Sequence, residues 1–140
     1  MYKEAIEACK QAIRINPDDA KAHSNLGLAY EKSGMYKEAI ESYKQSISIN
    51  PDDADVHHNL GLAYYPLGKY KEAIESYKQA IRLDPDDAKA HVGLGNAYCK
   101  SGKHKKAIKS HKQAIRINPE HLHITISVLS IVAQKIEVQP

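Results

Sequence analysis

Histidine is the residue type in this sequence with the widest chemical reach, because a neutral imidazole can bind a metal ion or transfer a proton. The chain holds 8 histidines, and three of them, His23, His57 and His91, recur one per 34 residues. Helices pack about 8–10 Å apart, whereas zinc needs its ligands at about 2.0–2.1 Å. Histidines on successive helical layers therefore do not converge on one ion. We predict that these three pack inside the protein and bind no metal.

Other reactive groups give no catalytic pattern. The 2 cysteines, Cys9 and Cys99, are too few and too distant in sequence for a disulfide framework or a zinc site. His23 and Ser24 are neighbours on an expected helix, so their side chains do not face each other as a nucleophile and its base would. No glycine-rich loop is present that would cradle a phosphate. We predict that the chain is not an enzyme and that it holds no cofactor and no metal.

The elements that carry these residues come from an internal repeat. Residues 20–53 match residues 54–87 at roughly two thirds of their positions, and residues 88–121 continue the same register. A unit of this length holds two short helices and two turns, and such units stack into solenoids. Each unit has an Asp before its first helix, a Gly after it and a Pro after its second helix. These positions are Asp19, Asp53, Asp87; Gly34, Gly68, Gly102; and Pro51, Pro85, Pro119.

Glycines inside the expected first helices indicate close helix packing. A glycine there costs about 1 kcal/mol relative to alanine, so its recurrence implies that a neighbouring helix approaches closely. We expect Gly27, Gly61 and Gly95 to face Ala39, Ala73 and Ala107 of the second helices. Pro66 lies near the end of one first helix and should shorten it by a turn.

Each of the three units contains Leu-Gly-x-x-Tyr, followed by an Ala, an aromatic residue and a Pro at fixed spacing, and in this pattern the chain resembles the tetratricopeptide repeat family. The resemblance covers residues 2–121 and implies an all-α fold, a right-handed superhelix of antiparallel helix pairs. His23, His57 and His91 stand where the family most often has Trp, and His104 and His111 replace tyrosines in the third copy, which should be the least stable. The family signature is carried by Leu26, Gly27, Tyr30, Ala39, Tyr43, Ser46 and Pro51, by Leu60, Gly61, Tyr64, Ala73, Tyr77, Ala80 and Pro85, and by Leu94, Gly95, Tyr98, Ala107, His111, Ala114 and Pro119.

The repeat predicts five segments. Residues 1–19 match the second helix of a truncated repeat, which suggests a fragment of a longer array. Residues 20–53, 54–87 and 88–121 are three full repeats, and residues 122–140 are an atypical end. Solenoids need a capping element there, whereas the alternating, β-branched sequence favours a strand or a disordered tail. We favour the capping helix.

The resemblance implies that peptides bind in a concave groove lined by the first helices. Asn25 and Asn59 form a ladder that Gly93 interrupts; a side-chain amide can donate to and accept from a peptide backbone, although this Asn is also partly structural in the family. Ser24, Leu28 and Gly93 occupy positions that chaperone-binding members use to clamp a carboxylate, which argues against a chaperone-tail adaptor. The predicted groove residues are Lys21, Ser24, Asn25, Leu28, Lys32, Asp55, His58, Asn59, Leu62, Tyr65, Lys89, Val92, Asn96 and Lys100.

Charge is divided unequally along the chain. Residues 1–87 hold 11 Lys and Arg against 15 Asp and Glu, whereas residues 88–140 hold 9 against 2. The basic block is a solvated face, or it binds an acidic protein, a neighbouring copy or nucleic acid. Nucleic acid is the weakest of these because no aromatic residue is interleaved for stacking on bases. Beyond Lys100, the block comprises Lys103, Lys105, Lys106, Lys109, Lys112 and Arg116.

Taken together, these patterns predict a protein–protein interaction module or scaffold that binds a protein or an extended peptide. A first alternative is a structural scaffold that self-associates through its exposed ends and the apolar segment 124–132. A second alternative is the regulatory arm of a larger enzyme. The sequence begins without the features of a signal peptide and contains no run of about 18–20 apolar residues. We therefore expect no membrane span and a cytoplasmic protein.

Overall fold

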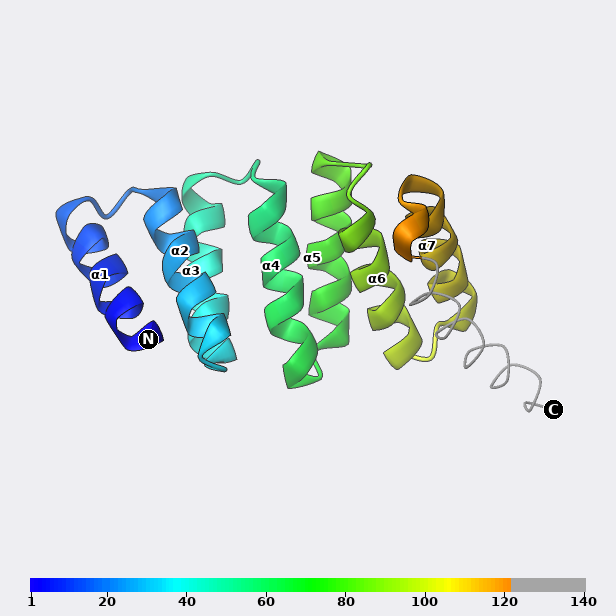
Figure 1. Cartoon of the computed structure of the whole chain (residues 1–140), viewed down its shortest axis with the longest axis horizontal. Helices are drawn as coiled ribbons and strands as arrows, with labels where there is room; N and C mark the ends of the chain where they lie inside the picture. The colour runs from blue at the N-terminus through cyan, green and yellow to red at the C-terminus, as the bar shows by residue number, and fades with distance from the viewer. Residues whose placement is uncertain (122–140) are drawn as a thin grey trace.

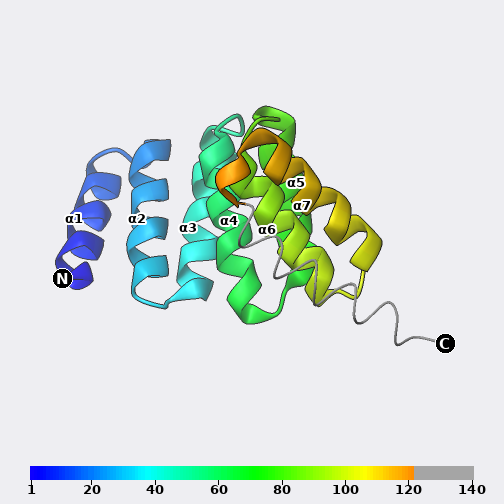
Figure 2. The same ribbon diagram turned by 45° about the vertical axis from the view of Figure 1, so that its right-hand side comes forward.

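A computed structural model describes residues 1–121 and builds them from helices alone (Figure 1). Successive helices follow one another along one axis, and Figure 2 shows that the described chain is elongated. The predicted all-α solenoid is confirmed. The α-helices are α1 (Tyr2–Ile15), α2 (Ala20–Lys32), α3 (Tyr36–Ile49), α4 (Ala54–Tyr64), α5 (Tyr70–Leu83), α6 (Ala88–Lys100) and α7 (His104–Ile117), and two short 3-10 helices are η1 (Tyr65–Leu67) and η2 (Pro119–His121).

The helices pack as antiparallel pairs. The most extensive contacts join α2 with α3, α4 with α5, and α6 with α7, and smaller interfaces join each pair to the next. The first helices of the pairs also touch each other along this axis, α2 with α4 and α4 with α6. We call the face of the molecule that these first helices form the inner face. The second helices, α3, α5 and α7, form the opposite, outer face.

The residues predicted to start and stop the helices do so. The carboxylate of Asp87 accepts hydrogen bonds from the backbone N–H groups of Lys89 and Ala90, at 3.0 and 3.3 Å. Asp19 and Asp53 cap α2 and α4 in the same way. The turn between the two helices of each pair needs a left-handed residue, which a glycine at φ 72 to 78° supplies.

Close helix packing is confirmed, but the predicted facing residues were wrong. A methyl group added at Gly27 would lie 2.6 Å from the ring of Tyr43, and one at Gly95 would lie 2.6 Å from the ring of His111. The glycines thus face the aromatic ring one turn beyond Ala39 and Ala107. The reason is size: a ring laid flat across a helix backbone leaves no space for a Cβ, whereas an alanine methyl does not reach that far.

Pro66 has the predicted effect on the helix that precedes it. The α-helix α4 spans 11 residues, against 13 for both α2 and α6. The last turn of the first helix is replaced by the 3-10 helix η1, which holds Pro66 in its first turn. Proline lacks an N–H group, so the α-helical bond at that position cannot form.

The three repeated histidines form hydrogen bonds with the turns that precede their helices. The Nε2 of His23, His57 and His91 lies 2.9, 2.9 and 3.1 Å from the carbonyl oxygen of the proline six residues earlier. A carbonyl oxygen only accepts, so each Nε2 carries the proton. Each ring therefore has a separate partner, in the turn that joins its repeat to the preceding segment. The predicted capping helix over residues 122–140 lies outside the described residues.

Candidate functional site: a groove between α4 and α6

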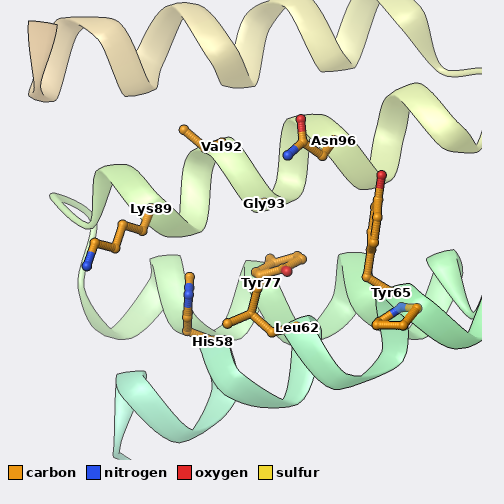
Figure 3. Close-up of a pocket in the computed structure, with 9 residues that line it drawn as sticks. His58, Leu62, Tyr65, Tyr77, Lys89, Val92, Gly93 and Asn96 are labelled. Atoms are coloured by element: carbon orange, nitrogen blue, oxygen red, sulfur yellow. The ribbon is translucent and has the colours of Figure 1, made fainter. Parts of the chain in front are cut away.

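A hollow of about 510 Å³ opens on the inner face between α4 and α6 (Figure 3). Its walls come from two first helices, and its floor comes from α5, the second helix between them. Most of the lining side chains are apolar or aromatic, as is usual for a site that binds a small group or a short peptide. The lining residues are His58, Leu62, Tyr65, Pro66, Tyr77, Lys89, Val92, Gly93 and Asn96.

Tyr77 forms the floor because glycines give its ring space on both sides. A methyl group at Gly61 would lie 2.8 Å from the ring, and one at Gly93 would lie 2.6 Å from it. Figure 3 shows the ring between the side chains of α4 and the backbone of α6. Burial raises the pKa of the Tyr77 hydroxyl, so the hydroxyl stays protonated.

The walls hold two further aromatic rings in fixed orientations. His58 packs edge-on against Tyr77, with ring centroids 5.6 Å apart. Tyr65 packs edge-on against Tyr70, with centroids 5.4 Å apart. Edge-to-face pairs of this kind add about 0.5–1.5 kcal/mol beyond area burial. The hollow is therefore preformed in the unliganded chain.

A wider hollow of about 930 Å³ adjoins the first and shares His58, Leu62 and Lys89 with it. Its outer rim is acidic. The carboxylates that line it are Asp55, Asp84, Asp86 and Asp87, against the single cation Lys89.

His58 stands where the two hollows meet. Its Nδ1 lies 4.0 Å from Asp87. Burial lowers the pKa of His58, and the nearby Asp87 and Asp55 oppose that shift only in part. The imidazole is therefore neutral at pH 7. We call the two joined hollows the inner groove, with an apolar part over Tyr77 and an acidic rim near Asp87.

The predicted groove residues divide into two sets. Those on α4 and η1, and those on α6 other than Lys100, come together in the inner groove. Those on α2 stand outside both hollows, as does Lys100. The residues within the inner groove are Asp55, His58, Asn59, Leu62, Tyr65, Lys89, Val92 and Asn96. The residues outside it are Lys21, Ser24, Asn25, Leu28, Lys32 and Lys100.

In the apolar part, sequence reasoning missed the lining residues Pro66, Tyr77 and Gly93. In the wider hollow it missed Asp84, Asp86, Asp87, Ala88, Ile117 and Asn118. It interpreted Gly93 only as a gap in the asparagine ladder. The sequence does contain a signal for Gly93. The previous repeat has Asn59 and Leu62 at the positions where this repeat has Gly93 and Asn96, so the Asn is displaced by about one helical turn. The vacated position is where the Tyr77 ring lies.

The basic block also divides. Lys106 and Lys109 line a third hollow of about 430 Å³, on the outer face between α5 and α7. Lys103, Lys105, Lys112 and Arg116 stand outside it; the Arg116 guanidinium donates to the Gln113 side chain at 3.0 Å.

Neither a cluster of metal-ligand side chains nor a membrane-spanning helix occurs within residues 1–121. In that range, no three His, Cys, Asp or Glu side chains are grouped so that they could hold a metal ion. No helix in the same range has the length and apolarity needed to span a membrane.

These features define a helical-repeat solenoid with a groove on its inner face. Family models described as TPR repeat match residues 1–34, 32–68 and 63–102, and a model described as tetratricopeptide repeat matches residues 88–121. The chain belongs to the tetratricopeptide repeat family. A sequence search of curated proteins finds no match.

Solved structures agree with this assignment. The crystal structure of MamA superposes with a TM-score of 0.94 at 26% identity, over 98% of this chain and 80% of that one. The second TPR domain of human RPAP3, in complex with the HSP70 peptide SGPTIEEVD, superposes with a TM-score of 0.77 at 29% identity, over 81% of this chain and 94% of that one. Family and relatives together support a protein-interaction module.

Proposed function

We propose that the chain is a peptide-binding module and that its ligand lies in the inner groove, over Tyr77 and between α4 and α6. The observation that carries the proposal is the preformed apolar hollow of about 510 Å³, whose walls are held by two aromatic pairs. The human RPAP3 domain, similar in fold, binds a peptide. The role is binding, without catalysis.

The lining chemistry suggests which peptide. Leu62 and Val92 face an apolar side chain, while Asn96 offers an amide that pairs with a peptide backbone. The acidic rim next to this part favours a basic residue on the ligand. The RPAP3 ligand ends in Glu-Glu-Val-Asp, and such a tail would meet the carboxylates of this rim. A ligand with an apolar anchor beside a Lys or Arg fits better.

The experiment is a selection of random displayed peptides on the whole chain, followed by affinity measurement of the enriched peptides by fluorescence anisotropy. Leu62→Asp places a charge in the apolar part and should weaken binding about tenfold or more. The control is Lys71→Ala, an exposed position on α5, which should leave affinity unchanged. Equal affinities for wild type and Leu62→Asp would refute the groove as the binding site.

A second candidate function, self-association, is favoured by α1. None of its residues is buried, and Ile15 is 85% exposed. Light scattering over a range of concentrations tests it: a mass that stays at one chain throughout would dismiss it. The apolar segment 124–132, which also motivated this idea, lies outside the described residues. The cytoplasmic location and the regulatory-arm alternative stay predictions.

A further inference from the structure

The hollow on the outer face, between α5 and α7, has a charge that its equivalents in the array do not have. Its floor is apolar: Ile81 is half-buried, and Leu94 and Tyr98 are 8% and 6% exposed. Its rim carries Lys78 from α5, together with Lys106 and Lys109 from α7. No Asp or Glu is among the lining residues. We call this hollow the outer groove.

The repeat supplies an internal comparison for the outer groove. One repeat earlier, between α3 and α5, the floor positions are Ile47, Leu60 and Tyr64, and Lys44 stands in place of Lys78. The floor and this lysine are therefore the same in both repeats. The remaining two rim positions differ: Glu72 and Glu75 stand where the outer groove has Lys106 and Lys109.

The earliest pair of helices follows the same rule. Between α1 and α3, the two variable rim positions are Glu38 and Glu41, next to Lys10. The three side chains thus sum to −1 at each of the two earlier positions and to +3 in the outer groove. Because floor and fold are shared, packing does not explain the reversal. A difference confined to the exposed rim is what a partner of specific charge would select.

The lysines stand close to the apolar floor. The Lys106 Nζ lies 5.7 Å from the centre of the Tyr98 ring, a cation–π distance. One repeat earlier, the Lys44 Nζ lies 6.0 Å from the centre of the Tyr64 ring, and Lys44 belongs to the other wall. In the outer groove, cations therefore stand on both walls of one apolar floor.

We propose that the outer groove binds an acidic segment of another protein. The carboxylates of that segment would pair with the three lysines, and one of its aliphatic or aromatic side chains would pack on the floor. Charge complementarity supports the carboxylates, and the apolar floor supports the anchor. The occupant is not the end of this chain, since residues 122–140 contain one acidic residue, Glu137. Nucleic acid fits less well, because Tyr98 is the one Tyr, Phe or Trp among the lining residues, whereas single strands are bound by several rings on which successive bases stack.

The test compares the wild type with Lys106→Glu/Lys109→Glu, which gives the outer groove the rim of the preceding repeat. That rim is compatible with the fold, because Glu72 and Glu75 occupy it one repeat earlier. Random displayed peptides are selected on each protein. The wild type should enrich peptides rich in Asp and Glu that contain one Leu, Ile, Met or Phe. Their affinity for the double variant, by fluorescence anisotropy, should fall about tenfold or more.

Two matched variants sharpen the result. Glu72→Lys/Glu75→Lys converts the preceding rim to the charge of the outer groove and should add a second site for the same peptides. Leu62→Asp, in the inner groove, should leave their affinity unchanged, so a failure of the inner-groove function is distinguished from a failure here. Circular dichroism confirms that each variant keeps its helical content.

Three outcomes would overturn the proposal. The enriched peptides carry no excess of acid, or they bind the double variant as tightly as the wild type. A labelled single-stranded oligo(dT) binds more tightly than the peptides and is lost in the double variant, which assigns the surface to nucleic acid. Light scattering finds a dimer that the double variant abolishes, which assigns it to a second copy.

Discussion

Helices α5 and α7 occupy equivalent places in successive repeats and differ at five positions, three of which fall into two kinds. The first kind is on the surface, where two glutamates become lysines. The second kind is in the core, where a tyrosine becomes a histidine. The differing pairs are Tyr70 and His104, Glu72 and Lys106, Glu75 and Lys109, Tyr77 and His111, and Leu83 and Ile117.

The core difference changes the hydrogen bonding of the buried ring in each repeat. Tyr77 and His111 are 1% and 0% exposed, and each lies against a glycine of its own first helix. Neither ring nitrogen of His111 finds a hydrogen-bond partner within residues 1–121. An unsatisfied buried polar group costs about 1–3 kcal/mol. The comparison teaches that the repeat keeps its helix geometry through Gly and Ala, while the ring between them sets its stability.

The largest effect should come from removing the ring in each repeat. Tyr77→Ala should lower the free energy of unfolding by about 3–5 kcal/mol, the usual cost of truncating a buried aromatic residue. His111→Ala should cost at most about 2 kcal/mol, because the same change also removes two unsatisfied polar atoms. Urea unfolding at pH 7.5, followed by circular dichroism, measures both. Equal losses would show that His111 is as well accommodated as Tyr77.

Restoring the missing tyrosine should have the next largest effect. His111→Tyr should raise the free energy of unfolding by about 1–3 kcal/mol, because it removes the unsatisfied nitrogens and fills the space over Gly95 with a ring used in both earlier repeats. The control is Lys112→Gln, an exposed position next in the chain, which should change stability by no more than about 0.5 kcal/mol. No gain from His111→Tyr would contradict this account.

The pH dependence of stability should separate the two repeats. Burial lowers the pKa of His111 in the folded chain, so below about pH 6.5 the unfolded chain takes up a proton that the folded chain does not. The free energy of unfolding therefore decreases as pH falls below that value, by up to about 1.4 kcal/mol per pH unit for His111 alone. The pKa of His58 is also lowered, and its contribution remains in both proteins. Unfolding of wild type and His111→Tyr between pH 7.5 and 5 tests this, and parallel curves would oppose it.

The smallest effect concerns the tyrosine hydroxyl groups. The Tyr43 hydroxyl donates to the Glu31 carboxylate at 3.0 Å, whereas the position equivalent to Glu31 in the next repeat is Tyr65. Tyr43→Phe should therefore cost about 1 kcal/mol, and Tyr77→Phe should cost less. The melting temperatures of the two variants, compared side by side, decide it; a larger loss for Tyr77→Phe would reverse the expected order.

Sequence alone predicted the parts of this fold that depend on local rules. Each of these features depends on groups within one short stretch of sequence. They are the helix starts at Asp19, Asp53 and Asp87, the turns at glycines and the shortened α4. Repetition then gave the stack, because identical units make identical interfaces. The family could be identified from these positions.

The candidate site was less predictable, because it depends on differences between repeats. Asn25 and Asn59 occupy equivalent positions, but only Asn59 lines the inner groove. Gly93 looked like a loss of function, although it is the residue that admits the Tyr77 ring to the groove floor. Counting lysines along the chain likewise did not separate Lys106 and Lys109, which line a hollow, from their basic neighbours.

The Tyr77 ring belongs to two repeats at once, since it lies against Gly61 of its own repeat and Gly93 of the next. In a linear array, the free energy shared across such an interface decides whether neighbouring units open together or one at a time. Tyr77 therefore contributes to the interface between the middle repeat and its C-terminal neighbour. Shortening that ring should weaken this interface and so reduce the cooperativity with which the two repeats unfold.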